Sequence, residues 1–284
     1  MRLRWLVIPT VALAATGAAL TLRAPGPSAP AQATPTPPAA ASAPPAASPD
    51  VAEPPLLAAR IVARFPHDAQ AFTEGLVWHD GALYESVGLE GRSDVRRVAL
   101  ASGKVTQRGV IPPAQFGEGL AAYEDRLVSL TWHDGVAHLW SARTLKSLGT
   151  ARYNGEGWGL TSDGRSLIRS DGSATLTFHD PVTLAEQRRL TVTLRGRSVT
   201  QLNELEWVDG QVLANVWHTP FLLRINPASG AVTAIIDLRP LVVEVAATNP
   251  EAVANGIAWD ATKRRLFVTG KLWPTLFEIA LPTN

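Results

Sequence analysis

The sequence predicts an all-β fold, a five-bladed β-propeller with four-stranded blades. Two observations predict it: a short motif recurs along the chain, and turn signals and short apolar runs follow each copy. The copies lie about 40–50 residues apart, the length of one four-stranded blade. Each begins with a polar residue or Trp and ends with an aliphatic residue: Glu74-Gly75-Leu76, Glu118-Gly119-Leu120, Trp158-Gly159-Leu160, Asn203-Glu204-Leu205 and Asn255-Gly256-Ile257.

The expected strands follow one another in the same order within each repeat. A polar turn separates the first strand from the second, as at His79-Asp80-Gly81. A third run alternates with a period of two residues, as in Leu222–Ile225, and the turn at Pro227–Gly230 leads to a fourth run over Val232–Leu238. Each repeat therefore predicts the four strands of one blade.

The closing strand is expected from the opposite end of the domain. The last repeat has no fourth apolar run, whereas Arg60–Arg64 is a strand-like run that precedes the first repeat. We expect this N-terminal strand to close the last blade, because closure of the ring removes an exposed sheet edge.

The chain divides into three expected regions. Residues 1–23 form a signal peptide or signal anchor, since Arg2 and Arg4 precede the apolar run Trp5–Leu22. Residues 24–56 are almost entirely Ala, Pro, Ser and Thr and are expected to be a disordered linker. Residues 57–284 are expected to form the five-bladed propeller domain. We expect export to the periplasm or the cell exterior, and residues 5–22, if they are not cleaved, would tether the protein to a membrane.

The composition excludes several classes of partner and chemistry. Without cysteine the chain has no disulfide, thiolate nucleophile or cysteine-bound metal. The net charge is +1 and no segment concentrates Lys and Arg beside aromatic residues, so no nucleic-acid partner is expected. The six histidines lack metal-ligand spacing, and no phosphate-binding loop or nucleophile elbow is present. We expect a monomer.

The repeat brings distant residues to one mouth of a central channel. The first-strand position supplies a first ring, which comprises Glu74, Glu118, Trp158, Asn203 and Asn255. The ends of the second strands supply a second ring, which comprises Glu85, Trp132, Asp171, Trp217 and Lys271. Aromatic walls with a few polar groups suit a small polar substrate. A carboxyl group among tryptophans and beside another carboxylate favours its protonated form and can act as a general acid.

Some of these residues also fit structural roles. Glu74 and Glu85 could hydrogen-bond blade backbone or pair with Arg92 or Lys271. The remaining strand tryptophans are expected to pack in the core or between blades; they are Trp78, Trp140, Trp207 and Trp259.

Several strings spread over all the repeats resemble the plant-type and bacterial glutaminyl-peptide cyclotransferases. The resemblance spans about Phe65 to Leu281 and is carried by Phe72-Thr73-Glu74-Gly75-Leu76, Leu83-Tyr84-Glu85-Ser86, Gly91-Arg92-Ser93, Phe116-Gly117-Glu118-Gly119-Leu120, Leu202-Asn203-Glu204-Leu205-Glu206 and Gly270-Lys271-Leu272-Trp273-Pro274. It implies a five-bladed propeller that converts the N-terminal glutamine of peptides and proteins to pyroglutamate and releases ammonia. It implies no cofactor and no metal.

The resemblance also implies roles for individual residues. Glu118 corresponds to the catalytic acid/base. Glu85 and Arg92 would form a supporting hydrogen-bond network. The expected substrate-binding residues are Asn203, Trp132, Trp158, Trp217, Lys271 and Glu74, and the family often carries glutamine at the last of these positions.

Two alternatives stay open at the level of the sequence. The oxygen-bearing side chains of the first ring would also suit a calcium-dependent lactonase-type propeller. A propeller that only binds a peptide is the second alternative, because a fold does not by itself define a function. A chelator separates the first alternative from a metal-free cyclase, whereas the presence of the acid Glu118 argues against the second.

Overall fold

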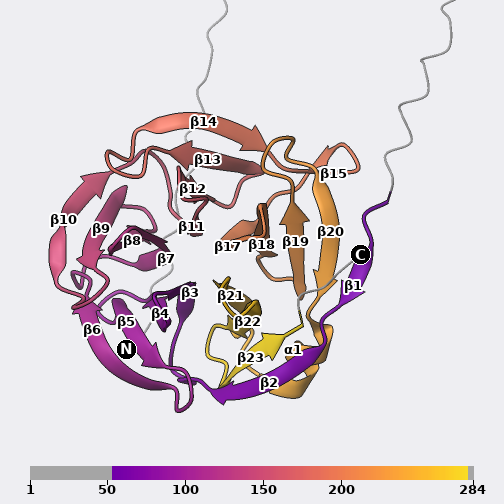
Figure 1. The fold of residues 1–284 in the computed structure, drawn as a ribbon, viewed down its shortest axis with the longest axis horizontal. Helices are drawn as coiled ribbons and strands as arrows, with labels where there is room; N and C mark the ends of the chain where they lie inside the picture. Colours follow the sequence, from indigo (N-terminus) through magenta and orange to yellow (C-terminus); the bar gives the residue numbers. More distant parts are fainter. Residues whose placement is uncertain (1–52, 281–284) are drawn as a thin grey trace, which may run out of the picture. The chain divides into compact units, whose positions relative to one another are not determined.

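The computed structural model describes residues 53–280, which form five antiparallel sheets arranged as blades around a central axis (Figure 1). This arrangement confirms the predicted five-bladed propeller. The expected signal segment, 1–23, and most of the expected linker lie outside the described residues. Strand β1 (Leu56–Ala58) begins at the last residue of that expected linker, so the folded region starts slightly earlier than the sequence indicated.

The first three blades each use four consecutive strands, and the first strand of each lies nearest the axis (Figure 1). The strands of the first blade are β3 (Thr73–His79), β4 (Ala82–Val87), β5 (Asp94–Ala99) and β6 (Lys104–Val110). Those of the second are β7 (Gly117–Tyr123), β8 (Arg126–Thr131), β9 (Val136–Ser141) and β10 (Ser147–Arg152). Those of the third are β11 (Leu160–Ser162), β12 (Leu167–Arg169), β13 (Thr175–His179) and β14 (Glu186–Thr191).

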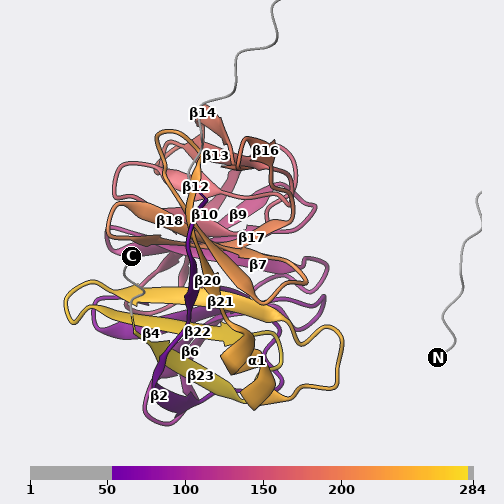
Figure 2. The same cartoon turned by 90° about the vertical axis from the view of Figure 1, so that its right-hand side faces the viewer.

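The last two blades complete the ring with help from the N-terminal strands. The fourth blade contains β17 (Leu202–Val208), β18 (Gln211–Val216), β19 (Phe221–Ile225) and β20 (Val232–Asp237). The fifth contains β21 (Ala254–Asp260), β22 (Arg265–Gly270), β23 (Thr275–Ile279) and, as its outer strand, β2 (Ile61–Pro66). Ile61 pairs with Ile279 in antiparallel register, which confirms the predicted closure. Strand β1 additionally pairs in parallel with β20, an addition that the sequence did not predict (Figures 1 and 2).

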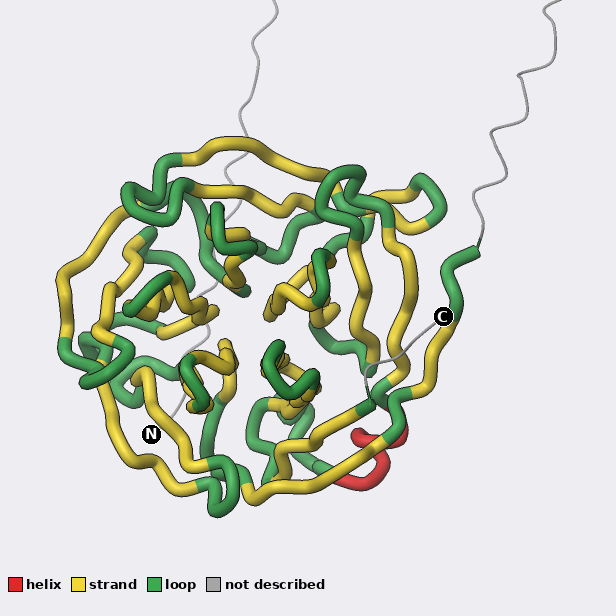
Figure 3. The backbone as a smooth tube through the Cα atoms, in the orientation of Figure 1, coloured by secondary structure: helices red, strands yellow, loops and turns green. Residues whose placement is uncertain are grey.

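Two small elements lie between the later blades. A hairpin of β15 (Thr193–Leu194) and β16 (Arg197–Ser198) links the third blade to the fourth. Helix α1 (Arg239–Val245) lies between the fourth and fifth blades at the rim of the ring (Figure 3) and explains why the last interval between motifs is the longest. Within residues 53–280, no helix is long and apolar enough to cross a membrane.

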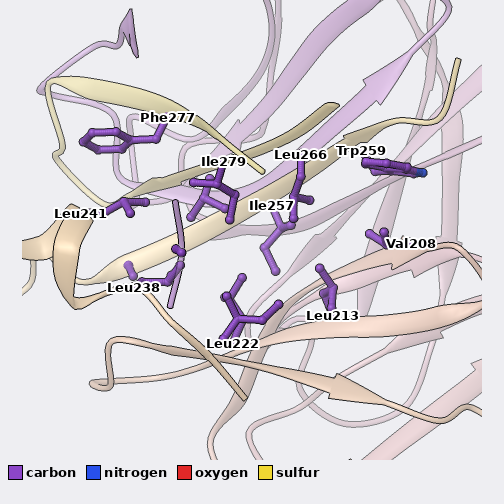
Figure 4. Packing of buried hydrophobic residues seen from close by; sticks show 14 of the residues in the cluster. Val208, Leu213, Leu222, Leu238, Leu241, Ile257, Trp259, Leu266, Phe277 and Ile279 are labelled. Carbon is purple, nitrogen blue, oxygen red and sulfur yellow. The ribbon is translucent and has the colours of Figure 1, made fainter. Parts of the chain in front are cut away.

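Buried apolar side chains hold neighbouring blades together. Between the fourth and fifth blades, Leu213 and Leu222 pack in one cluster with Ile257, Leu266 and Phe277 (Figure 4). Burial of one such side chain stabilises the fold by roughly 1.5–3 kcal/mol. The four tryptophans assigned to packing lie as predicted: each is buried or packs against a core side chain, and they are Trp78, Trp140, Trp207 and Trp259.

The repeated motif bends the inner strands where its polar residue stands. In four of the inner strands the register shifts at this point; the shifts lie at Thr73/Gly75, Gly117/Leu120, Leu202/Leu205 and Ala254/Ile257. A bulge of this kind changes the direction in which a side chain points. Close packing between blades requires the glycine of the motif in the second blade, because a Cβ on Gly119 would lie 2.5 Å from the backbone of Trp158 and Leu160.

Candidate active site

A cavity of about 250 Å³ lies where the inner strands begin, at one mouth of the channel. Its walls contain all seven residues assigned to catalysis or substrate binding by the sequence, together with three others; the lining residues are Phe72, Glu74, Phe116, Glu118, Trp132, Trp158, Asn203, Trp217, Glu251 and Lys271. Glu74, Glu118 and Asn203 come from inner strands β3, β7 and β17. Trp132, Trp217 and Lys271 directly follow second strands, as the alignment of the repeats predicts.

Five aromatic rings form the apolar wall of the cavity. Phe116 contacts Phe72 and Trp132 edge to face, with ring centroids 6.1 and 5.5 Å apart. Trp158 and Trp217 make a second edge-to-face pair, at 5.6 Å. These distances are typical of favourable aromatic pairs. The wall therefore has a defined shape that suits the apolar stem of a small substrate.

A buried ion pair lies at the base of the cavity. Lys271 Nζ donates to Glu74 Oε1 at 2.7 Å and also lies 4.5 Å from the centre of the Phe72 ring. The Asn255 side-chain amide donates to the other oxygen of Glu74 at 3.2 Å. Burial raises the pKa of Glu74 to about 7, although the charge of Lys271 opposes this rise. Both oxygens of Glu74 are thus occupied by protein donors.

Glu118 differs from every other buried carboxyl group within residues 53–280. Its side chain lines the cavity and its residue is 6% exposed, yet its carboxyl group makes no hydrogen bond to that part of the chain. Burial raises its pKa well above the usual value, the negative charges of Glu74 and Glu156 raise it further, and Lys271 opposes them. The result is a carboxyl group that favours the protonated form and has both oxygens open to a ligand.

Two further polar atoms of the lining residues lack protein partners. Asn203 Oδ1 and Trp217 Nε1 are buried and have no hydrogen-bond partner among the described residues. A buried polar group without a partner costs about 1–3 kcal/mol. An unused acceptor and an unused donor at a cavity are therefore suited to receive complementary groups of a ligand.

The network expected around Glu85 and Arg92 has different members. Glu85 does not line the cavity; its Oε1 accepts from Thr73 Oγ1 at 2.7 Å and lies 3.0 Å from His67 Nε2. Burial alone would raise the pKa of Glu85, but the charge and hydrogen bond of His67 hold it below its usual value. Arg92 is exposed, and its side chain makes no hydrogen bond within residues 53–280. Arg96, on β5, is the buried arginine whose charge acts on Glu85.

Besides Glu85, two members of the predicted rings do not line the cavity. Asn255 is fully buried beneath it and binds Glu74, whereas Asp171 bonds to Ser173 in its own turn. The sequence interpretation missed three lining residues. Phe72 and Phe116 stand two positions before the repeated glutamates, so the repeat contained the signal for both. Glu251 comes from the segment between α1 and β21, which has no counterpart in the other repeats.

A closed propeller with an aromatic cavity and an unpaired, buried acid at its channel mouth has the architecture of an enzyme that acts on a small polar group. The model of the glutamine cyclotransferase family matches residues 34–281. The chain is 41% identical over 225 residues to the glutaminyl-peptide cyclotransferase of Arabidopsis thaliana, an alignment that covers 78% of this chain and 70% of the plant protein. The crystal structure of Myxococcus xanthus glutaminyl cyclase superposes with a TM-score of 0.77 and 43% identity, covering 81% of this chain and 99% of that one. The chain belongs to the glutamine cyclotransferase family.

Proposed function

We propose that this protein is a glutaminyl-peptide cyclotransferase that converts the N-terminal glutamine of peptides and proteins to pyroglutamate with release of ammonia. The observation that carries the proposal is the state of Glu118: a buried carboxyl group with a raised pKa and no hydrogen-bond partner within residues 53–280, at the wall of the cavity. This is the state that a general acid requires near neutral pH. The family membership supports the same reaction.

The reaction needs a proton at the leaving nitrogen. The α-amine of the substrate attacks the side-chain amide carbon, which forms the ring C–N bond and places negative charge on the amide oxygen. Glu118 then gives its proton to the amide nitrogen, so that the old C–N bond breaks and ammonia leaves. The carboxylate of Glu118 takes up the proton that the attacking amine loses, which restores the acid.

The unpaired atoms of the cavity fit the other needs of this reaction. Trp217 Nε1 is an N–H donor suited to the developing oxyanion, and Asn203 Oδ1 is an acceptor suited to an N–H group of the substrate. The aromatic wall would hold the glutamine side chain folded toward its own amine, which lowers the entropic part of the barrier.

The arrangement favours a reaction without a metal over the calcium-dependent alternative. Of the two carboxylates in the first ring, Glu74 already has the ammonium group of Lys271 at 2.7 Å. A second positive charge there would be repelled by the first. On the sequence pattern of residues 1–23 we also propose that the protein is exported to the periplasm or the cell exterior.

An ammonia-release assay with the full chain tests the proposal. A glutaminyl dipeptide is incubated with the protein, with and without EDTA, and ammonia is measured together with the mass lost from the peptide. Equal release in both samples, matched by the loss of one ammonia from the peptide mass, is expected. Release that EDTA abolishes would overturn the metal-free mechanism, and no release by folded protein would overturn the proposed activity.

A further inference from the structure

One acidic side chain beside the cavity holds two of its tryptophans. Glu156 Oε2 accepts a hydrogen bond from Trp132 Nε1 at 2.9 Å and another from Trp158 Nε1 at 3.0 Å. Both indole rings line the cavity, whereas Glu156 itself does not. A charged acceptor makes these bonds stronger than bonds between neutral groups. One carboxylate oxygen therefore fixes the orientation of two rings that come from different blades.

This contact joins the two halves of the aromatic wall. On one side, Trp132 packs against Phe116, which in turn packs against Phe72. On the other side, Trp158 packs against Trp217, which also lines the cavity and whose indole N–H has no hydrogen-bond partner among the described residues. Glu156 lies between the two groups and is the hydrogen-bonded link that connects them. Loss of this link would free both tryptophans to turn about their side-chain bonds.

The loop that carries Glu156 is itself held in place. The buried side chain of Arg169 donates to the backbone carbonyl of Glu156 and, at 3.0 Å, to that of Asn154. The backbone N–H of Gly157 donates to the carbonyl of Trp132 at 3.0 Å. The Tyr153 hydroxyl donates to the carbonyl of Thr131. The carboxylate is thus presented from a backbone that is fastened on both sides, as a positioning group requires.

The charge of Glu156 also reaches the proposed acid. Several ionisable groups face Glu118 from the surrounding elements, and they are Glu74 on β3, Lys271 after β22, Tyr153 and Glu156 in the loop before β11, and Glu251 before β21. Glu156 is one of the two negative groups that favour the protonated form of Glu118. Because its side chain is 45% exposed, this effect should weaken as salt is added.

We propose that Glu156 is a positioning residue for the cyclisation: it fixes the rings of Trp132 and Trp158 through one carboxylate oxygen and sets a negative charge beside the Glu118 cavity. The inference rests on the proposed function, since a positioning role in cyclisation presupposes that reaction. Glu156 makes two contributions, as a hydrogen-bond acceptor and as a negative charge, and two variants separate them. A glutamine at this position retains the acceptor and removes the charge, whereas an alanine removes both.

Kinetics of the full chain with a glutaminyl dipeptide test the two contributions. Glu156→Ala should raise KM about 10-fold or more while kcat changes less, because the rings no longer preorganise the substrate site. Glu156→Gln should restore KM to within about 3-fold of wild type, since its carbonyl oxygen still accepts from the indoles. Its alkaline limb of kcat/KM should move to lower pH by roughly half a unit at low salt, because removal of a negative charge favours ionisation of Glu118. That shift should shrink at high salt.

A measurement that does not depend on turnover tests the positioning of the two tryptophans separately from the reaction. In two-dimensional ¹H–¹⁵N spectra, the indole N–H signals of Trp132 and Trp158, assigned through Trp132→Phe and Trp158→Phe, should both move in Glu156→Ala. The matched control Asp134→Asn removes an exposed acidic group two residues after Trp132 and should leave spectra, KM and pH profile unchanged.

Each failure has a separate meaning. Unmoved indole signals together with unchanged KM in Glu156→Ala would overturn the positioning role. Equal losses in the Gln and Ala variants, with an unshifted pH profile and a lowered melting temperature, would show a merely structural residue and overturn it as well. If the indole signals move in Glu156→Ala but the wild-type protein releases no ammonia, the proposed function is overturned instead.

Discussion

The channel contains buried carboxyl groups near both of its mouths, and they differ in what their oxygens contact. At the cavity, Glu118 has no hydrogen-bond partner within the described residues. Further along the channel, both oxygens of Glu204 are occupied, since Oε1 accepts from Leu76 N at 3.2 Å and Oε2 from Ile257 N at 2.9 Å. Burial raises the pKa of both groups well above the usual value. A raised pKa alone therefore does not distinguish a chemical role from a structural one, whereas the hydrogen-bond partners do.

Glu206 extends the contrast to the opposite mouth. It lines a second cavity, of about 360 Å³, formed where the inner strands end. Its Oε1 accepts from Trp259 N at 2.8 Å and its Oε2 from Thr161 Oγ1 at 3.3 Å. Glu204 and Glu206 both come from the fourth blade and bind groups of other blades. They connect the inner strands where the chain offers no covalent cross-link.

The largest effect on activity is expected at the unpaired acid. Glu118→Gln should lower kcat by roughly 10²-fold or more, because the amide cannot transfer the proton that the leaving nitrogen needs. The melting temperature should hardly change, since no protein hydrogen bond of the described residues is lost. Steady-state ammonia release and thermal unfolding on the same preparation check both statements. Near-wild-type turnover with intact folding would remove Glu118 from its assigned role.

The opposite outcome is expected at Glu204. Glu204→Gln replaces one accepting oxygen with an NH₂ group, which leaves the N–H of Leu76 or Ile257 without an acceptor. The free energy of unfolding should fall by about 1–3 kcal/mol, while turnover per folded molecule stays within a few fold of wild type. Denaturant unfolding and an activity assay at low temperature measure the two quantities. The exposed Glu90→Gln serves as control and should change neither. A large loss of turnover per folded molecule without a fall in the free energy of unfolding would contradict a structural role for Glu204.

The smallest effect is a change in pH dependence at Glu206. Burial raises the pKa of Glu206 to about 8, so the folded protein retains a proton that the unfolded chain has already released. Its contribution to stability is therefore full below the ordinary glutamate pKa and is lost as the pH rises toward 8. Glu206→Gln cannot ionise and should flatten this part of the curve. Melting temperatures from pH 5 to 9 check it; parallel curves for the two proteins would refute the raised pKa.

Repetition explains how much of the site could be predicted. Because the inner strands repeat the same geometry, equivalent motif positions become neighbours, which located Glu118 and Asn203 without a structure. The network around Glu85 was harder, since the choice between Arg92 and Arg96 depends on which arginine lies in a strand that turns its side chain inward. Arg92 stands in a turn and Arg96 in β5.

The connections between blades were harder to predict in this way. Glu251 belongs to a segment that does not recur, so no spacing argument places it at the cavity. Glu156 stands two positions before Trp158, as Phe72 and Phe116 stand before the repeated glutamates, but the repeat does not show that its carboxylate contacts Trp132. The short strand β1 was missed for a related reason. Leu56–Ala58 has too few residues to show a period of two, and only the parallel edge of β20 makes it a strand.

The closure of the ring by β2 also determines the order in which this protein can be completed. Ile61 pairs with Ile279, so a strand synthesised early has its partner only when nearly the whole described chain has been made. Contacts this distant along a chain are slow to form, because the intervening segment must first lose much of its freedom. Until then the outer edge of the fifth blade stays unpaired and can associate with other chains. Formation of the hydrogen bonds between β2 and β23 is therefore the step that closes the ring of blades.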